Sequence, residues 1–236
     1  MFFIKDNQLK IFLLGIKLSI RINNFFKNEV YLIDSKGKQK RIYHSPRNLK
    51  IRFLGENAKI FLPKGKFFKN SKLICGTNSF VKIDTPHNWG LNDLFMEVHH
   101  RSSLHIKENC CIKGGFITAC GSGIKIQIGS DCMFSDGIII RTHDGHTIYD
   151  KTTKQPVNMP KDVIIGDHCW LAKNVSIFKG VKITKNVIIG ANSIVTKNIE
   201  QENSLVVGNP AKVVKTNVDW DRRFNDYFIN NFQGGE

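Results

Sequence analysis

An aliphatic residue recurs at every sixth position in the last third of the chain. The series runs Ile165, Leu171, Ile177, Ile183, Ile189 and Val195. A helix requires a period near 3.6 and an alternating strand a period of 2, so neither element explains this spacing. Glycine directly follows Ile165 and Ile189, and the positions four residues after each aliphatic residue are mostly small or β-branched. The pattern predicts a coil of short strands in which glycine permits the tight turns.

Three hexads are expected to form one triangular coil, so residues 18 apart stack at about 4.8 Å, the spacing of neighbouring strands. The predicted pairs are Ile165 with Ile183, Leu171 with Ile189, and Ile177 with Val195. Weaker traces place Ile128, Phe134 and Ile140 in one earlier coil, Ile106, Ile112 and Thr118 in another, and Leu54, Ile60, Phe68, Ile74 and Phe80 in the first turns. The sequence therefore predicts an all-β fold, a parallel β-helix over residues 48–200.

The six-residue period is lost twice, near residues 84–98 and 146–162. Pro156 and Pro160 indicate that the second interruption is a loop. Long loops in a compact repeat fold are more often functional than accidental. We therefore expect the second interruption to carry function.

The two ends of the chain do not follow the repeat. Residues 1–47 are expected to be a non-repeat segment, with a hairpin over 28–44 that turns at 35–38. Residues 9–26 have the pattern of a basic amphipathic helix, which either contacts a membrane peripherally or packs on the repeat or on another subunit. Residues 201–236 are expected to leave the repeat and form a helix over 219–232 that closes the last coil.

Charge narrows the set of partners. The chain has 236 residues and a formal net charge of +15, which implies an anionic partner such as a nucleic acid, a membrane surface or an acidic small molecule. There is no recognition-helix pattern, zinc-finger spacing or RNA-binding aromatic motif, so nucleic acid is not expected. No apolar stretch is long enough to predict a membrane-spanning helix. The six cysteines form no disulfide-like framework, which favours a reducing cytoplasm.

Three motifs occur in phase with the repeat. They are Thr-His-Asp-Gly-His-Thr-Ile-Tyr-Asp from Thr142, Ile-Gly-Asp-His-Cys-Trp-Leu from Ile165, and Gly-Asn-Pro-Ala-Lys-Val-Val from Gly208. Together they resemble the left-handed β-helix acyltransferases with hexapeptide repeats, and among these the O-acetyltransferases of bacterial capsule and lipopolysaccharide sugars, such as polysialic acid. The resemblance implies left-handed coils and a homotrimer with active sites between subunits. Acetyl-CoA is then the co-substrate, and no metal is expected.

A sugar hydroxyl is a poor nucleophile unless a base removes its proton as it attacks the thioester. Neutral histidine suits this role. By resemblance, His146 is the base in a direct transfer without an acyl-enzyme, and Trp170 contacts the pantetheine arm or the acceptor. His143 stands where the family usually has serine, and it either orients the acceptor or has no role. Asp144 either fixes the loop or hydrogen-bonds the histidine or the sugar.

The resemblance also implies a binding site for acetyl-CoA. Gly190 and Ala191 correspond to positions beside the pantetheine arm. Thr196, Lys197 and Lys212 correspond to positions at the nucleotide end, although both lysines are equally explained as solvated charges. Ala172-Lys173 stands where the family motif ends in glycine-alanine or glycine-serine, and Lys173 is expected to contact CoA or an anionic sugar.

The predicted function is acetyl-CoA-dependent O-acetylation of an acidic bacterial surface polysaccharide in the cytoplasm, or at the inner face of the membrane. N-acetylation of an amino sugar nucleotide is an alternative, because an amine acceptor also needs a base. A metal-binding protein similar to the γ-class carbonic anhydrases is a further alternative, for which His143, His146 and His168 would supply imidazoles. A basic scaffold that binds an anionic polymer without catalysis is the last.

Overall fold

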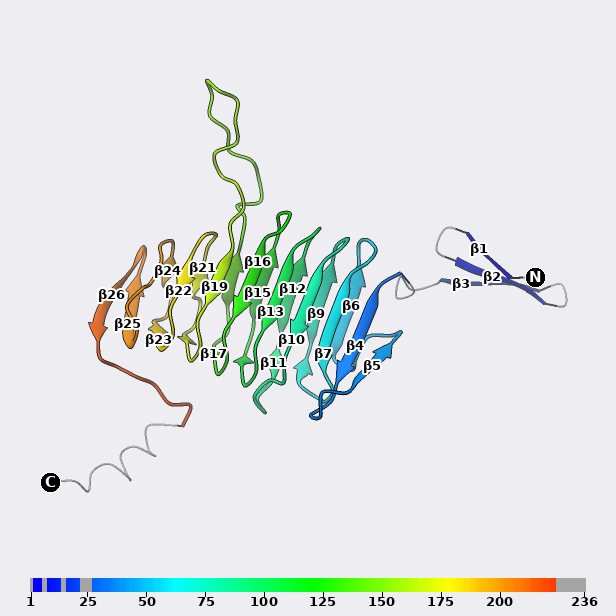
Figure 1. Ribbon diagram of the computed structural model, residues 1–236, viewed down its shortest axis with the longest axis horizontal. Helices are drawn as coiled ribbons and strands as arrows, with labels where there is room; N and C mark the ends of the chain where they lie inside the picture. Colours follow the sequence, from blue (N-terminus) through cyan, green and yellow to red (C-terminus); the bar gives the residue numbers. More distant parts are fainter. Residues whose placement is uncertain (1, 6–7, 14–15, 22–26, 224–236) are drawn as a thin grey trace.

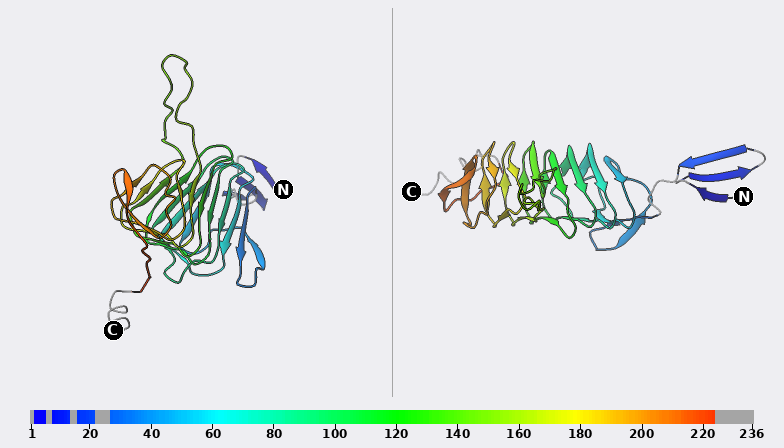
Figure 2. Two further views of the ribbon diagram at one scale, coloured as in Figure 1. Left: turned by 60° about the vertical axis from the view of Figure 1, so that its left-hand side comes forward. Right: turned by 90° about the horizontal axis from the view of Figure 1, so that it is seen from above.

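The computed structural model describes residues 2–5, 8–13, 16–21 and 27–223, and side chains only within 27–223. Most of this chain winds into a left-handed parallel β-helix whose flat sides are three sheets (Figure 1). The chain visits the three sheets in turn, so each sheet receives one strand per coil. Viewed from above, successive coils lie side by side along the long axis of the molecule (Figure 2).

The first sheet contains β4 (Glu29–Ile33), β5 (Gln39–Ile42), β7 (Lys59–Pro63), β10 (Phe80–Ile83), β13 (Ser103–Ile106), β16 (Lys125–Ile128), β19 (Val163–Ile165) and β22 (Lys182–Ile183). The second contains β8 (Phe68–Lys69), β11 (Leu91–Asn92), β14 (Cys111–Ile112), β17 (Met133–Phe134), β20 (Trp170–Leu171), β23 (Val187–Ile189), β25 (Ser204–Gly208) and β26 (Ala211–Thr216). The third contains β6 (Leu49–Phe53), β9 (Ser71–Cys75), β12 (Leu94–Val98), β15 (Gly115–Ala119), β18 (Ile138–Arg141), β21 (Ser176–Ile177) and β24 (Ile194–Val195).

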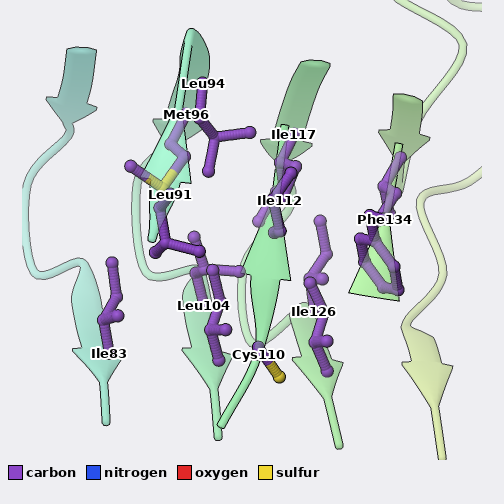
Figure 3. Packing of buried hydrophobic residues seen from close by; sticks show 14 of the residues in the cluster. Ile83, Leu91, Leu94, Met96, Leu104, Cys110, Ile112, Ile117, Ile126 and Phe134 are labelled. Carbon is purple, nitrogen blue, oxygen red and sulfur yellow. The ribbon is translucent and has the colours of Figure 1, made fainter. Parts of the chain in front are cut away.

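The predicted stacking register is confirmed in the last coils. Ile165 pairs with Ile183, Leu171 with Ile189, and Ile177 with Val195. All six side chains are buried, because the inward position of each short strand faces the axis of the coil. The column of Leu171 and Ile189 continues into earlier coils through Phe134 and Ile112, which lie next to each other (Figure 3).

The earlier coils are longer than the predicted 18 residues. Val81 pairs with Leu104 and Leu104 with Ile126, which are spacings of 23 and 22 residues. The longer edges shift the phase, so the prediction is wrong for part of the first turns: Leu54 and Phe80 are exposed. Ile117 rather than Thr118 pairs with Ile140, although Thr118 is also buried.

Two strands occupy the second half of the segment predicted as the first loop. β11 and β12 lie within 84–98 and pair with strands of the coils on both sides, so the part outside strands is 84–90 and the single residue Asp93 between them. The period was obscured there because this coil has a longer edge. Between β18 and β19, by contrast, the chain leaves the coils and projects far from them (Figure 1).

The glycines that directly follow an inward aliphatic residue have a different role from the predicted one, whereas Gly137 and Gly180 do take the left-handed conformation, with φ of 72° and 81°. Gly129 and Gly166 are not in the left-handed conformation. A Cβ on Gly129 would lie 2.4 Å from the carbonyl carbon of Gly166, and one on Gly166 would lie 2.6 Å from that of Thr184. The left-handed turn falls instead on Asp131 and His168, with φ of 58° and 53°. Glycine is therefore needed for the close approach of neighbouring coils.

The N-terminal region contains strands where a helix was considered. β1 (Phe2–Lys5), β2 (Gln8–Leu13) and β3 (Ile16–Arg21) form an antiparallel sheet, so the amphipathic-helix interpretation is wrong for residues 9–13 and 16–21, and the rest of 9–26 lies outside the described residues. The predicted hairpin is confirmed, since β4 pairs antiparallel with β5. β4 also pairs in parallel with β7, which makes it the first rung of the coil stack.

At the other end, β25 and β26 form an antiparallel hairpin that turns through a cis Asn209–Pro210 bond. Of the helix predicted for 219–232, residues 219–223 are not helical, and the rest lies outside the described residues. Within the part of the chain that the structure describes, no helix is long and apolar enough to cross a membrane.

Candidate active site

The projecting loop is tied to the coils by Asp144. Its carboxylate forms an ion pair with Lys179, which lies after β21, and accepts a hydrogen bond from Asn158 Nδ2 at 2.9 Å. Lys179 Nζ also donates to the carbonyl of Asn158 at 3.0 Å, so the two arms of the loop are joined near the base. The lysine holds the pKa of Asp144 below its ordinary value. Within 27–223, the hydrogen bond and ion pair of the Asp144 carboxylate are therefore those expected of a residue that fixes the loop.

His146 lies on this loop with an exposed side chain. Its carbonyl accepts a hydrogen bond from Asn158 Nδ2 at 2.8 Å, which fixes the backbone at the position of the predicted base. The anchoring network thus holds the main chain of His146 and leaves the imidazole accessible.

His143 lies at the root of the loop, half-buried against β15. Its Nδ1 accepts the Gly145 N–H at 2.9 Å, and Nε2 lies 3.3 Å from Thr118 Oγ1. Burial, followed by the charge of Arg141, lowers the pKa of His143. A neutral ring that donates from Nε2 and accepts at Nδ1 satisfies both contacts. In this chain His143 therefore braces the loop where it leaves the coils.

Trp170 is positioned by β20 on the outer face of the second sheet. It pairs with Met133 on one side and with Ile188 on the other. The loop of His146 leaves from β18, in the third sheet. Within 27–223 of one chain, no ring contact or hydrogen bond joins His146 to Trp170, so the structure does not bring the two together in a single subunit.

The residues predicted to bind acetyl-CoA lie at two separate corners. The Gly190 N–H donates to the carbonyl of Val206 at 2.8 Å, and Lys212 pairs with the next residue, Val207. Gly190 and Lys212 therefore lie close together, and Ala191 is exposed beside Gly190. Thr196 and Lys197 are exposed after β24, which belongs to the third sheet. One chain therefore groups Gly190, Ala191 and Lys212, and places the other pair elsewhere.

Lys173 is engaged by an acidic neighbour. Its ammonium lies 3.2 Å from Asp136 Oδ2 on the preceding coil, and this contact lowers the pKa of Asp136. Both side chains are largely exposed, so the pair is weak and exchangeable with an anionic ligand. Lys173 is accordingly available for the predicted contact only after it leaves Asp136.

A C-terminal strap, residues 219–223, crosses the corners next to Trp170. The Trp220 ring stacks on His168 at 4.4 Å and lies 6.2 Å from the Trp170 ring. His168 Nδ1 contacts Asp131 Oδ2 at 2.6 Å and Nε2 contacts Asp219 Oδ1 at 3.2 Å. The strap thus adds a buried aromatic side chain to the surroundings of Trp170.

The alternative of a metal site gains no support from the described residues. Within 27–223 there is no group of three or more His, Cys, Asp or Glu side chains that could hold a metal ion. His168 is engaged by two aspartates and His143 by the loop root, so the imidazoles considered for zinc are separate.

Comparison with known proteins agrees with the coil pattern. Residues 162–197 match the family model described as bacterial transferase hexapeptide (six repeats). A polysialic acid O-acetyltransferase of Neisseria meningitidis is 35% identical over 172 residues, which cover 72% of this chain and 78% of the relative. The chain belongs to the hexapeptide-repeat transferase family.

Two further relatives of this hexapeptide-repeat transferase carry similar names. A polysialic acid O-acetyltransferase of Escherichia coli O1:K1 is 33% identical over 138 residues, half of this chain, but the match spans only 45% of that relative. The crystal structure of the polySia-specific acetyltransferase NeuO superimposes with a TM-score of 0.66 at 28% identity, covering 84% of this chain and 79% of that one. These relatives support an O-acetyltransferase assignment for the transferase.

Sequence reasoning about the transferase missed the strap and its contacts. Arg222 lies 2.7 Å from Asp131 Oδ1 and donates to the carbonyl of Asn109 at 2.8 Å, although 113 positions separate the two residues. The available signal was the mixture of aromatic and charged residues from 219 onward, which pointed to a helix instead. No local pattern could reveal which corner this segment contacts.

Proposed function

We propose that this protein transfers an acetyl group from acetyl-CoA to a sugar hydroxyl of an acidic bacterial surface polysaccharide. The observation that carries the proposal is the 35% identity to a polysialic acid O-acetyltransferase over most of both chains. The TM-score of 0.66 with the acetyltransferase NeuO supports it. The formal charge of +15 suits both an acidic glycan and the phosphates of CoA. We place this reaction in the cytoplasm.

In the proposed reaction, His146 in its neutral form takes the hydroxyl proton as the oxygen attacks the thioester carbon. The new C–O bond forms, the C–S bond breaks, and the proton passes to the departing thiolate of CoA. Trp170 borders the pantetheine arm or the acceptor, Gly190 and Ala191 lie beside the pantetheine arm, and Thr196, Lys197 and Lys212 lie at the nucleotide end of acetyl-CoA. A backbone N–H near the same corner stabilises the oxyanion.

We further propose a homotrimer in which this site is completed between subunits. Two observations support the arrangement: His146 is exposed on a loop that projects from the coils, and Trp170 lies in another sheet of the same chain. A projecting loop can approach a second copy of the coils and lie beside the strands of that subunit that are proposed to bind acetyl-CoA. Peripheral contact with the inner face of the membrane through residues 1–47 remains part of the proposal.

The experiment is release of CoA from acetyl-CoA in the presence of polysialic acid, compared with neutral glucose oligomers. We expect His146→Ala to lower kcat about 10²–10⁴-fold, because a general base contributes a factor of this size. The matched control is His100→Ala, which removes an exposed histidine outside the site. Full activity of the His146 variant would overturn the mechanism. Alkali treatment of the product separates an O-ester, which is cleaved, from an amide, which survives.

A further inference from the structure

The outer face of the second sheet is hollowed next to Trp170. A pocket of about 360 Å³ lies over β11, β14 and β17, the three strands that precede β20. Cys111 pairs with Met133 and Met133 with Trp170, while the Ile112 N–H bonds to the carbonyl of Gly90, so these positions form one row. The side chains in the row shrink from an indole through a thioether and a thiol to a hydrogen atom. The hollow exists because the row loses volume away from Trp170.

An exposed tryptophan forms one wall of the pocket. Trp89 is 52% exposed, yet its position is fixed. Its backbone N–H donates to His87 Nδ1 at 3.2 Å, its carbonyl accepts from Asn92 Nδ2 at 2.9 Å, and the His87 ring packs edge-on at 5.0 Å. Covering a water-exposed indole face with an apolar surface is favourable, because both surfaces are removed from water. The C–H face of a sugar ring is such a surface.

A polar row runs beside the wall. Leu91 pairs with Ile112 and Ile112 with Phe134, and the residue after each of them, Asn92, Lys113 and Ser135, lines the pocket. An amide, an ammonium and a hydroxyl offer donors and acceptors to sugar hydroxyls. Among the described residues that line the pocket, Lys113 alone is charged, so an anionic group is favoured there.

We propose that this hollow, the Trp89 pocket, binds an anionic sugar unit of the acceptor polysaccharide beside the unit that is acetylated at Trp170. The inference rests on the proposed function. Strands stack at about 4.8 Å, so the middle of the pocket lies roughly 10 Å from Trp170. At this distance the pocket contacts a different sugar unit of the acceptor polysaccharide from the one that is acetylated. Recognition then depends on the length of the acceptor.

The test measures acetylation of polysialic acid oligomers of increasing defined length. Trp89→Ala is expected to raise KM for long oligomers about tenfold and Lys113→Gln about three- to tenfold, with the effect growing with length. Trp89→Phe retains an aromatic face and is expected to restore most of the affinity. The matched controls are Tyr43→Ala, another exposed aromatic, and Lys182→Gln, which removes the same charge from the first sheet.

The possible outcomes separate the pocket from the reaction. If the pocket variants match their controls at every length, the pocket proposal is wrong. If no glycan is acetylated, the proposed function fails, and calorimetric titration of the same oligomers into the full chain decides the pocket. Weaker binding by both pocket variants then supports it, whereas no binding, or binding equal to the controls, overturns it. Equal binding of neutral glucose oligomers would overturn the anionic specificity.

Discussion

At the scale of single residues, the corners explain why the repeat tolerates so little change at some glycines. Gly166 has backbone of the next coil on the side where a side chain would project. Asp131 and His168 carry the left-handed turn, so their backbone and side-chain roles are separate. His168 uses its ring to hold Asp131 and Asp219, while its carbonyl accepts the Trp220 indole N–H at 3.0 Å.

Gly166→Ala is expected to lower the free energy of unfolding by about 1–3 kcal/mol, since its methyl group must displace backbone in a packed corner. Gly114→Ala is the matched control, because its Cβ would meet its nearest neighbours at 3.7 Å, an ordinary contact. Thermal denaturation followed by circular dichroism compares the two. Equal melting temperatures would contradict the close-approach role of Gly166.

At the scale of elements, the loop between β18 and β19 is held by two titrating groups. The lowered pKa of His143 means that the unfolded loop binds a proton more readily than the folded one, so the folded loop loses stability as pH falls below about 6.5. Asp144 stabilises the loop at pH values above its ordinary pKa of 3.8, and this contribution is lost as pH falls through its lowered pKa. Both groups therefore loosen the loop in acid.

Hydrogen exchange of residues 142–162, corrected for its intrinsic pH dependence, is expected to be faster at pH 5.5 than at pH 7.5. His143→Gln removes this pH dependence, whereas His100→Gln, a variant of an exposed histidine, preserves it. Asp144→Asn is expected to accelerate exchange at both values, because it removes the charge that pairs with Lys179. An unchanged pH profile in the His143 variant would contradict the bracing role.

The strap is the second element whose role can be tested. Arg222→Gln leaves carboxylate and carbonyl groups of two corners without their donor, so we expect a loss of about 1–3 kcal/mol of stability. Arg223→Gln is the matched control, since its side chain contacts Asp221 two residues away. Denaturation with urea, followed by tryptophan fluorescence, measures the difference. Equal midpoints would show that the strap contributes no stability.

At the scale of the whole molecule, the proposed trimer and the charge make a joint prediction. The specific activity is expected to fall when the protein is diluted until the trimer dissociates, because each site needs two subunits. KM for polysialic acid is expected to rise with salt, since a basic surface attracts an acidic glycan less at a shorter screening length. Light scattering and kinetics over a dilution series test the first point. Constant activity in a monomer would contradict the shared site.

The sequence predicts a structural feature correctly where neighbouring residues determine it, and fails where distant contacts do. The stacking of Ile165 with Ile183 was predicted correctly because each hexad in the last coils repeats the same strand and turn. Near Phe80 the coils lengthen, and a fixed period assigns the wrong phase. The loop residues from Asp144 to His146 were found through a motif, whereas the partner of Asp144, Lys179, lies 35 positions away and had no local signal.

By itself the sequence determined the parallel β-helix, the register of its last coils, the excursion after β18, and the family. All of these follow from periodicity and short motifs, which act between neighbours along the chain. Only the tertiary structure decided which glycines are squeezed between coils, how Asp144 and His143 brace the loop, where the strap lies, and that a hollow opens beside Trp170. These features arise where segments distant in sequence meet. The complementary volumes and charges at such contacts produce no periodic pattern in the sequence, so the sequence alone does not predict them.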